Sequence, residues 1–275
     1  VDLTGAALNI SVGLPAGNLE PQWAKVSAER AFISIPGTVE SVEGTQEARA
    51  MPEVKEFFLR VSAGDEVCFP TNNVEKCGNV IAVDEVRERA CEAAEAATRT
   101  VFVRLRPKER KTARYLFGSG EQRIEDAFTL FVPENHRRFE ELEPLRFADA
   151  APAPGKPEEN GSGARNPEPE ILIAPLPSLE LEDARDWHGS SLAEALEKTL
   201  ADTGCRLTPD QSVVDGAAGT SVELGRIFWT ALLRGGRQGG VWLIETVRQL
   251  LNEGTDPLVW WNALQEEAVT VVEDA

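Results

Sequence analysis

The chain has 275 residues, of which 42% are hydrophobic and 27% are charged, a balance typical of globular proteins with a buried core. Its formal net charge of −18 argues against nucleic acid as a partner, because binding a polyanion relies on clustered Lys and Arg, and it disfavours an anionic membrane surface. The acid is concentrated in residues 148–275, which carry 22 Asp and Glu against 9 Lys and Arg. We therefore expect a protein partner of this half to present a basic or apolar face.

No apolar stretch reaches the roughly 18 residues that a membrane-spanning helix needs, and no charged-then-apolar leader opens the chain. The four cysteines, Cys68, Cys77, Cys91 and Cys205, form no CxxC pair. We expect them to be buried or half-buried free thiols, in preference to disulfides or ligands of a zinc site. Reduced thiols are typical of the cytoplasm, which is the expected location.

The first 107 residues mix helical and extended patterns. Residues 1–12 carry apolar side chains at helical spacing, which predicts an amphipathic helix. Alternating runs at 31–36 and 38–42 flank a Pro-Gly turn, and this arrangement predicts a β-hairpin. Further strands are predicted at 54–61, 79–83 and 100–105, and helices at 45–51 and 87–100. Residues 1–107 are thus expected to form an α+β module, an antiparallel sheet with helices on one face.

Composition changes after this module. Residues 108–147 are basic and then mixed, and we expect them to form a charged extension that is exposed to solvent. Residues 148–169 are dominated by Pro, Gly, Ser, Glu and Asn, which predicts a flexible linker. A short apolar run at 171–174, ended by a proline, is a candidate strand.

Residues 170–275 are expected to form a small, mostly helical accessory domain. Ser191 and Glu194 form a capping box ahead of an apolar-periodic run, which marks the start of a helix. A later helix ends at Gly235-Gly236 and is followed by another, and Asp256-Pro257 is a strong signal for the start of a last one.

No catalytic, cofactor-binding or metal-binding residue is assigned from the sequence. The chain has two histidines, His136 and His188, and neither has an Asp or Cys at a spacing that indicates a triad. Trp187-His188 precedes a helix start, so we expect it to lie in a surface loop. The glycines from 235 to 240 lack the Lys-Ser/Thr that a phosphate-binding loop needs.

Tryptophans are frequent in the predicted C-terminal helices. Core packing explains most of them, but adjacent helical residues point about 100° apart and seldom face one core together. We therefore keep two interpretations of Trp260 and Trp261: core residues, or an exposed partner-binding face.

Four features of the first module occur in a recognisable order. They are a Gly-Xaa-Val hairpin at 37–39, a Val-Glu-Gly turn at 42–44, a Gly-Asp turn at 64–65 and a Gly-x-Val-Ile-Ala strand at 78–82 before an Ala-rich helix. With the segments VDLTGAALNISVGLP, AFISIPGTVESVEGTQEARAMPEV, SAGDEV and CGNVIAVDEVRERACEAA, this order resembles the closing portion of ATP-grasp carboxylate–amine ligases, most of all the L-amino-acid-ligase and carbamoyl-phosphate-synthase-like branch. The resemblance covers residues 1–106 and departs after the strand, where the family commonly has Gly-Asp-Thr.

The resemblance implies ligation through an acyl-phosphate, with ATP and magnesium as cofactors of a full-length relative. In the family, the Lys, Glu and Asn residues that hold ATP and magnesium lie upstream of the matched segment. The resemblance therefore implies no cofactor bound by this chain alone. It also leaves open whether the chain is an enzyme. A missing ATP-grasp catalytic region or subunit is the first partner expected. The alternative is a non-enzymatic adaptor that binds a protein through its C-terminal helical bundle.

Overall fold

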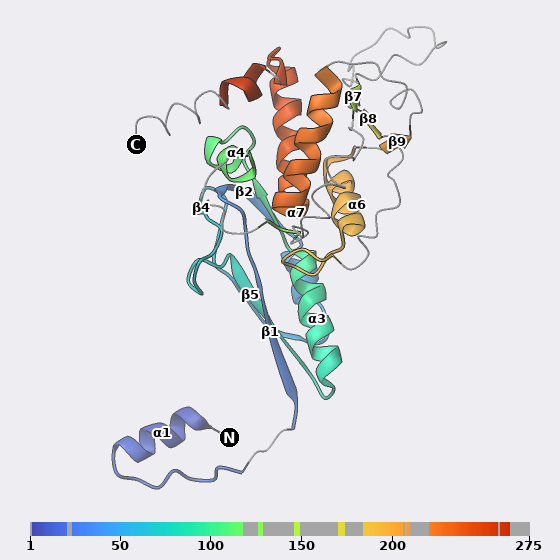
Figure 1. Ribbon diagram of the computed structural model, residues 1–275. Coiled ribbons are helices and arrows are strands. Elements are labelled where there is room, and N and C mark those ends of the chain that lie inside the picture. Colours follow the sequence, from blue (N-terminus) through green and yellow to red (C-terminus); the bar gives the residue numbers. More distant parts are fainter. Residues whose placement is uncertain are drawn as a thin grey trace, which may run out of the picture.

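The computed structural model of the protein (Figure 1) describes residues 2–20, 24–117, 126–128, 146–148, 170–173, 184–205, 207–209, 220–257 and 259–264. Apart from its first residue, the predicted linker at 148–169 lies outside this set. Within the described residues, no helix is both long enough and apolar enough to span a membrane.

The first sheet has the strand order β1-β5-β3, with every pair antiparallel. Its strands are β1 (Val26–Phe32), β3 (Val54–Leu59) and β5 (Gly78–Asp84). Helix α3 (Arg87–Thr100) packs on this sheet through small side chains, which let helix and strands approach closely. The buried residues of this contact are Ala28, Ala82, Ala90 and Ala94.

The second sheet has the order β4-β2-β6 and is also antiparallel. It consists of β2 (Gly37–Glu43), β4 (Glu66–Val67) and β6 (Phe102–Leu105), and the short helix α2 (Thr45–Arg49) follows β2. The α+β class predicted from the sequence is therefore confirmed, with the strands divided between two sheets.

The predicted hairpin across Pro36-Gly37 is wrong. Strand β1 pairs with β5, and the chain then crosses to the second sheet, where β2 pairs with β4 and β6. The N–H groups of Ile33 and Ile35 donate to side chains far away in the sequence, and Pro36 has no N–H to donate. These donors are engaged elsewhere, and the two runs belong to different sheets.

Helix α4 (Arg110–Phe117) lies where the sequence predicted only a charged extension. Its basic residues face outward, but Thr112, Ala113 and Leu116 are buried and pack against the rest of the chain. The apolar stripe is only two turns long, and the basic residues between its members made the helical periodicity hard to recognise in the sequence.

The C-terminal region is mostly helical, as expected. Helix α6 (Leu192–Thr203) begins with the predicted capping box: Ser191 Oγ accepts the N–H of Glu194 at 3.2 Å, and the Glu194 carboxylate accepts the N–H of Ser191 at 2.7 Å. Residues 257 and 259–264 are helical and follow Asp256, as the predicted helix start at Asp256-Pro257 requires.

Helix α7 (Thr220–Asn252) is interrupted at Gly236, whose φ of 58° and ψ of −151° are not helical. The interruption matches the predicted stop at Gly235-Gly236 and divides α7 into two halves that lie side by side in Figure 1. A third, mixed sheet comprises β7 (Arg146–Ala148), β8 (Glu170–Ile173) and β9 (Leu207–Pro209), in the order β7-β8-β9.

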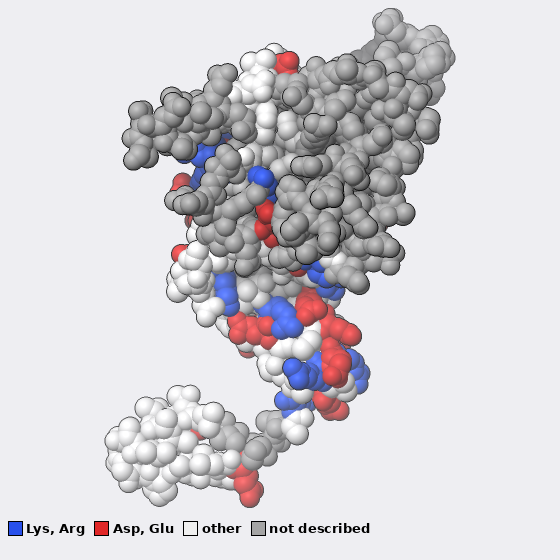
Figure 2. All heavy atoms as spheres, in the orientation of Figure 1, with Lys and Arg blue, Asp and Glu red and all other residues white. Residues whose placement is uncertain are grey.

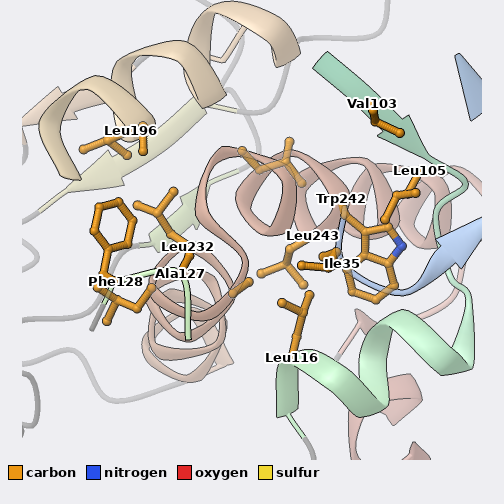
Figure 3. Close-up of a cluster of buried hydrophobic side chains, with 14 of the residues drawn as sticks. Ile35, Val103, Leu105, Leu116, Ala127, Phe128, Leu196, Leu232, Trp242 and Leu243 are labelled. Carbon is orange, nitrogen blue, oxygen red and sulfur yellow. The ribbon is translucent and has the colours of Figure 1, made fainter. Parts of the chain in front are cut away.

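The N-terminal sheets and the C-terminal helices share one hydrophobic core (Figure 3). Trp242 of α7 is almost fully buried against this core, and its indole N–H donates to the carbonyl of Arg106 at 2.9 Å. The helices thus pack directly on the sheets. Buried residues contributed by the two parts include Phe32, Ile35, Val39, Val103, Leu105 and Leu116, and Leu196, Phe228, Leu232, Leu243 and Ile244.

Gln238, just after the interruption in α7, makes the central polar contact between the two parts. Its Oε1 accepts the N–H of Ile35 at 2.9 Å, and its Nε2 donates to Ser34 Oγ at 2.8 Å and to the carbonyl of Val103 at 2.6 Å. One amide therefore satisfies backbone groups of the crossing segment and of β6. An unpaired buried backbone group is costly, so this side chain fixes how the helices sit on the sheets.

The change Gln238→Leu should lower the free energy of unfolding by about 2–5 kcal/mol, because it keeps side-chain volume but leaves the Ile35 N–H and the Val103 carbonyl without partners. Gln249→Leu is the matched control, since Gln249 lies in the same half of α7 and bonds only the nearby Glu253. Urea unfolding followed by circular dichroism measures both. Equal effects of the two variants would contradict the bridging role.

Gly239 lets the two halves of α7 approach each other backbone to backbone. A Cβ at this position would lie 2.2 Å from the carbonyl oxygen of Ala231. We expect Gly239→Ala to destabilise the protein by about 3 kcal/mol, the scale of overpacking a tight contact. Gly254, with a φ of 72° and nothing within 4 Å of its Cβ position, is the control: Gly254→Ala adds backbone strain alone, about 1 kcal/mol. A smaller loss at Gly239 than at Gly254 would disprove the close approach.

Candidate functional site

A small cavity lies on the boundary between the sheets and the helices, and we call it the seam cavity. It encloses about 40 Å³, room for roughly three water molecules at 10–15 Å³ each. Its walls come from the end of β1, the start of β6, the C-terminus of α3, the segment before α6, and the interruption in α7. The polar and charged side chains that line it are Arg99, Asp186, His188, Ser190, Lys198, Arg237 and Gln238.

Three cations meet at the C-terminal end of α3. Lys198 Nζ and Arg237 Nη1 both donate to the carbonyl of Arg99, at 3.4 Å and 3.5 Å. Positive charge at a helix C-terminus is favourable because the last carbonyls carry partial negative charge. Arg237 is also held by Asp202 through two hydrogen bonds of 2.5 Å and 2.8 Å, and its guanidinium lies 4.3 Å from the centroid of the Phe102 ring.

Lys198 is the least compensated of these cations. Its side chain is half-buried, and the pKa of its ammonium is lowered by burial first and by the charges of Arg237 and Arg99 next. Among the residues that the structure describes, neither Lys198 nor Arg99 has a carboxylate oxygen within 4.0 Å, although Asp186 and Glu194 lie close enough to act on Lys198 electrostatically.

Asp186 shapes the segment in front of α6. One carboxylate oxygen accepts the N–H of His188 at 2.9 Å and the N–H of Ser190 at 2.8 Å, which closes a tight turn. This turn presents the His188 ring to the end of β1, where Nε2 accepts the N–H of Ile33 at 3.2 Å. A ring nitrogen that accepts a hydrogen bond carries no proton, so the imidazole is neutral with its proton on Nδ1.

His188 lies in a loop just ahead of α6, as expected, but its ring contacts the end of β1 instead of standing in solvent. The ring is half-buried, and its partner Ile33 is 155 positions away in the sequence. The pKa of His188 is lowered, chiefly by burial; the carboxylate of Asp186 opposes this shift, while the charges of Arg237 and Lys198 add to it. No local pattern could have indicated this contact.

The seam cavity suits a small anion better than a nucleotide. No group of three His, Cys, Asp or Glu in the described part of the chain could hold a metal ion. The space within the cavity is far below the ~300 Å³ at which ligand pockets begin. The seam cavity therefore does not fit ATP, and His188 Nε2 at its wall is already engaged with a backbone N–H.

Trp260 and Trp261 are both half-buried, so neither side chain is fully exposed. Trp261 packs edge-on against Phe117 with ring centroids 4.0 Å apart, and the ring of Trp260 lies 6.5 Å from that of Trp242. Each therefore contacts the core through a different neighbour. A partner-binding role for the pair stays a prediction.

All four cysteines are free thiols. Cys77 and Cys205 are buried and Cys91 is half-buried, as expected, whereas Cys68 is exposed. Burial, with a smaller contribution from Cys68, raises the pKa of Cys77 to about 12, so Cys77 carries no thiolate near neutral pH and is unreactive.

His188 should make stability depend on pH. Because its pKa is lower in the folded protein than the ordinary 6.5, the unfolded chain binds more protons as pH falls below about 6.5, and stability declines until the folded pKa is passed. The decline can reach about 1.4 kcal/mol per pH unit. We expect His188→Gln, which keeps an acceptor for Ile33, to flatten the decline between pH 6.5 and pH 5.5 in urea unfolding. An unchanged slope in this variant would rule out His188 as the titrating group.

Comparisons with known proteins identify one part of the chain. Residues 31–106 match the family model of L-amino acid ligase C-terminal domain 2. The crystal structure of L-amino acid ligase from Bacillus licheniformis is similar with 15% identity and a TM-score of 0.28, over 33% of this chain and 22% of that one. The chain thus spans about a fifth of that ligase, and no curated protein matches it. Residues 31–106 are therefore similar to the C-terminal portion of an ATP-grasp L-amino acid ligase, as the resemblance in the sequence predicted.

Proposed function

We propose that the chain acts as the C-terminal part of an ATP-grasp ligase, which joins a carboxylate to an amine through an acyl-phosphate. In this proposal, ATP and magnesium are bound by a catalytic region outside these 275 residues. The match of residues 31–106 to the ligase domain supports the assignment.

The observation that carries the proposal is the apolar surface of α1 (Leu3–Ser11). Figure 1 shows this helix standing apart from the two sheets, and residues 3–19 contain no charged side chain. Leu3, Leu8 and Ile10 are 72%, 63% and 61% exposed, and Val12 and Leu14, which follow the helix, are exposed as well. In Figure 2 this end of the molecule is almost free of Lys, Arg, Asp and Glu.

Leu3, Ala6, Ala7 and Ile10 form one apolar face of this helix, and such a face is normally packed against another element. Exposed apolar patches of this kind mark interaction sites. We therefore infer that α1 docks on the catalytic region, either as a preceding part of the same polypeptide or as a separate subunit. Free thiols support a cytoplasmic location for the assembly.

The proposal is tested with the ATP-grasp region encoded immediately upstream, supplied as a separate protein. The chain alone should show no heat of binding with Mg·ATP in isothermal titration. The mixture should release phosphate from ATP only when amino acids are added. The double change Leu3→Glu and Ile10→Glu should abolish binding between the two proteins and reduce phosphate release at least tenfold, because it places charges on the apolar face of α1.

Val74→Glu is the matched control, because Val74 is 82% exposed but lies far from α1 in the sequence. This variant should bind and release phosphate like the unchanged chain. Micromolar binding of Mg·ATP to the chain alone would contradict the proposal, and so would an upstream sequence without an ATP-grasp region. Full activity of the α1 double variant would show that docking uses another surface.

A further inference from the structure

The seam cavity has an excess of positive charge in a strongly acidic protein. Arg99, Lys198 and Arg237 line it, and Asp186 is the one carboxylate among the lining residues. Asp202 pairs with Arg237, and Glu194 acts on Lys198 and Arg99 at longer range. The lining thus carries three cations against one carboxylate, in a chain whose formal net charge is −18.

Among the described residues, Lys198 and Arg99 are the lining cations that have no carboxylate oxygen within 4.0 Å. Arg237 is committed to Asp202 by two hydrogen bonds and lies against the Phe102 ring. Lys198 makes one long hydrogen bond of 3.4 Å, to the carbonyl of Arg99, although an ammonium carries three donors. Its lowered pKa reflects burial together with repulsion from Arg237 and Arg99, and a bound anion would relieve that repulsion.

A further donor at the cavity also has no partner. The indole Nε1 of Trp187, a lining residue, is buried and forms no hydrogen bond. A buried N–H without an acceptor costs about 1–3 kcal/mol and calls for an explanation such as a water or a ligand. This second observation does not depend on the charge of the lysine.

We propose that the seam cavity binds a small oxyanion, a carboxylate or phosphate group held by Lys198 and Arg99. The volume of about 40 Å³ matches such a group and excludes a nucleotide. The site lies at the contact between the ligase-like sheets and the C-terminal helices, so a bound anion would stabilise their packing. The proposal goes beyond the ligase function and does not depend on it.

The test uses the whole chain and measures its thermal unfolding midpoint during titration with sodium acetate, sodium phosphate and sodium chloride at matched ionic strength. We expect a saturable rise with acetate, phosphate or both that chloride does not reproduce. A response to acetate alone identifies a carboxylate site, and a response to phosphate alone identifies a phosphate site. Line broadening of ¹³C-acetate or ³¹P-phosphate resonances measures binding directly in the unmodified chain.

Lys198→Gln and Arg99→Gln should each weaken binding at least tenfold, roughly the loss of one charge-assisted hydrogen bond. Lys55→Gln is the control: Lys55 is an exposed lysine whose ammonium bonds only the carbonyl of Pro52. Two results would overturn the proposal. One is that neither acetate nor phosphate exceeds chloride and neither resonance broadens. The other is that Lys198→Gln and Arg99→Gln both bind as tightly as Lys55→Gln.

Discussion

The amide of Gln238 is the contact on which the arrangement of this protein depends. It accepts the N–H of Ile35 and donates to the carbonyl of Val103, so it binds backbone groups of both the crossing segment and β6. Because Ile35 bonds this amide, the chain leaves the first sheet and crosses to the second instead of folding back as a hairpin. Gln238 can reach these groups only because α7 breaks at Gly236, two residues earlier. The interruption at Gly236, the crossing from the first sheet to the second and the shared core therefore depend on one another.

Local signals in the sequence predicted most of the elements. Helix α3 coincides with its predicted range because an Ala- and Glu-rich stretch has strong helix propensity, and α6 starts at its capping box. Which strands pair with one another could not be predicted from local signals. The run at 31–36 has the alternation of a hairpin strand, yet its N–H groups are taken by side chains that follow it by 155 and 203 positions.

The candidate site was hidden for a related reason. Lys198 and Arg237 both come from the half of the chain with the larger acidic excess, so the net charge of that half does not reveal them. Arg99 lies in the other half and joins them only when α3 ends beside α6. His188 gave no signal because its partner is a backbone N–H, which every residue except proline has. By contrast, the apolar residues of α1 were visible in the sequence, and the structure shows that their side chains are exposed to solvent.

The long separation between Gln238 and Ile35 has a consequence for how the protein is made. A ribosome adds roughly 5–20 residues per second, so Ile35 is synthesised about 10–40 s before Gln238. During that interval the nascent sheets lack the helices that cover Val103, Leu105 and Leu116. Nascent chains with exposed apolar surface are the ones that chaperones bind. The packing of the sheets thus has to wait until α7 has been synthesised.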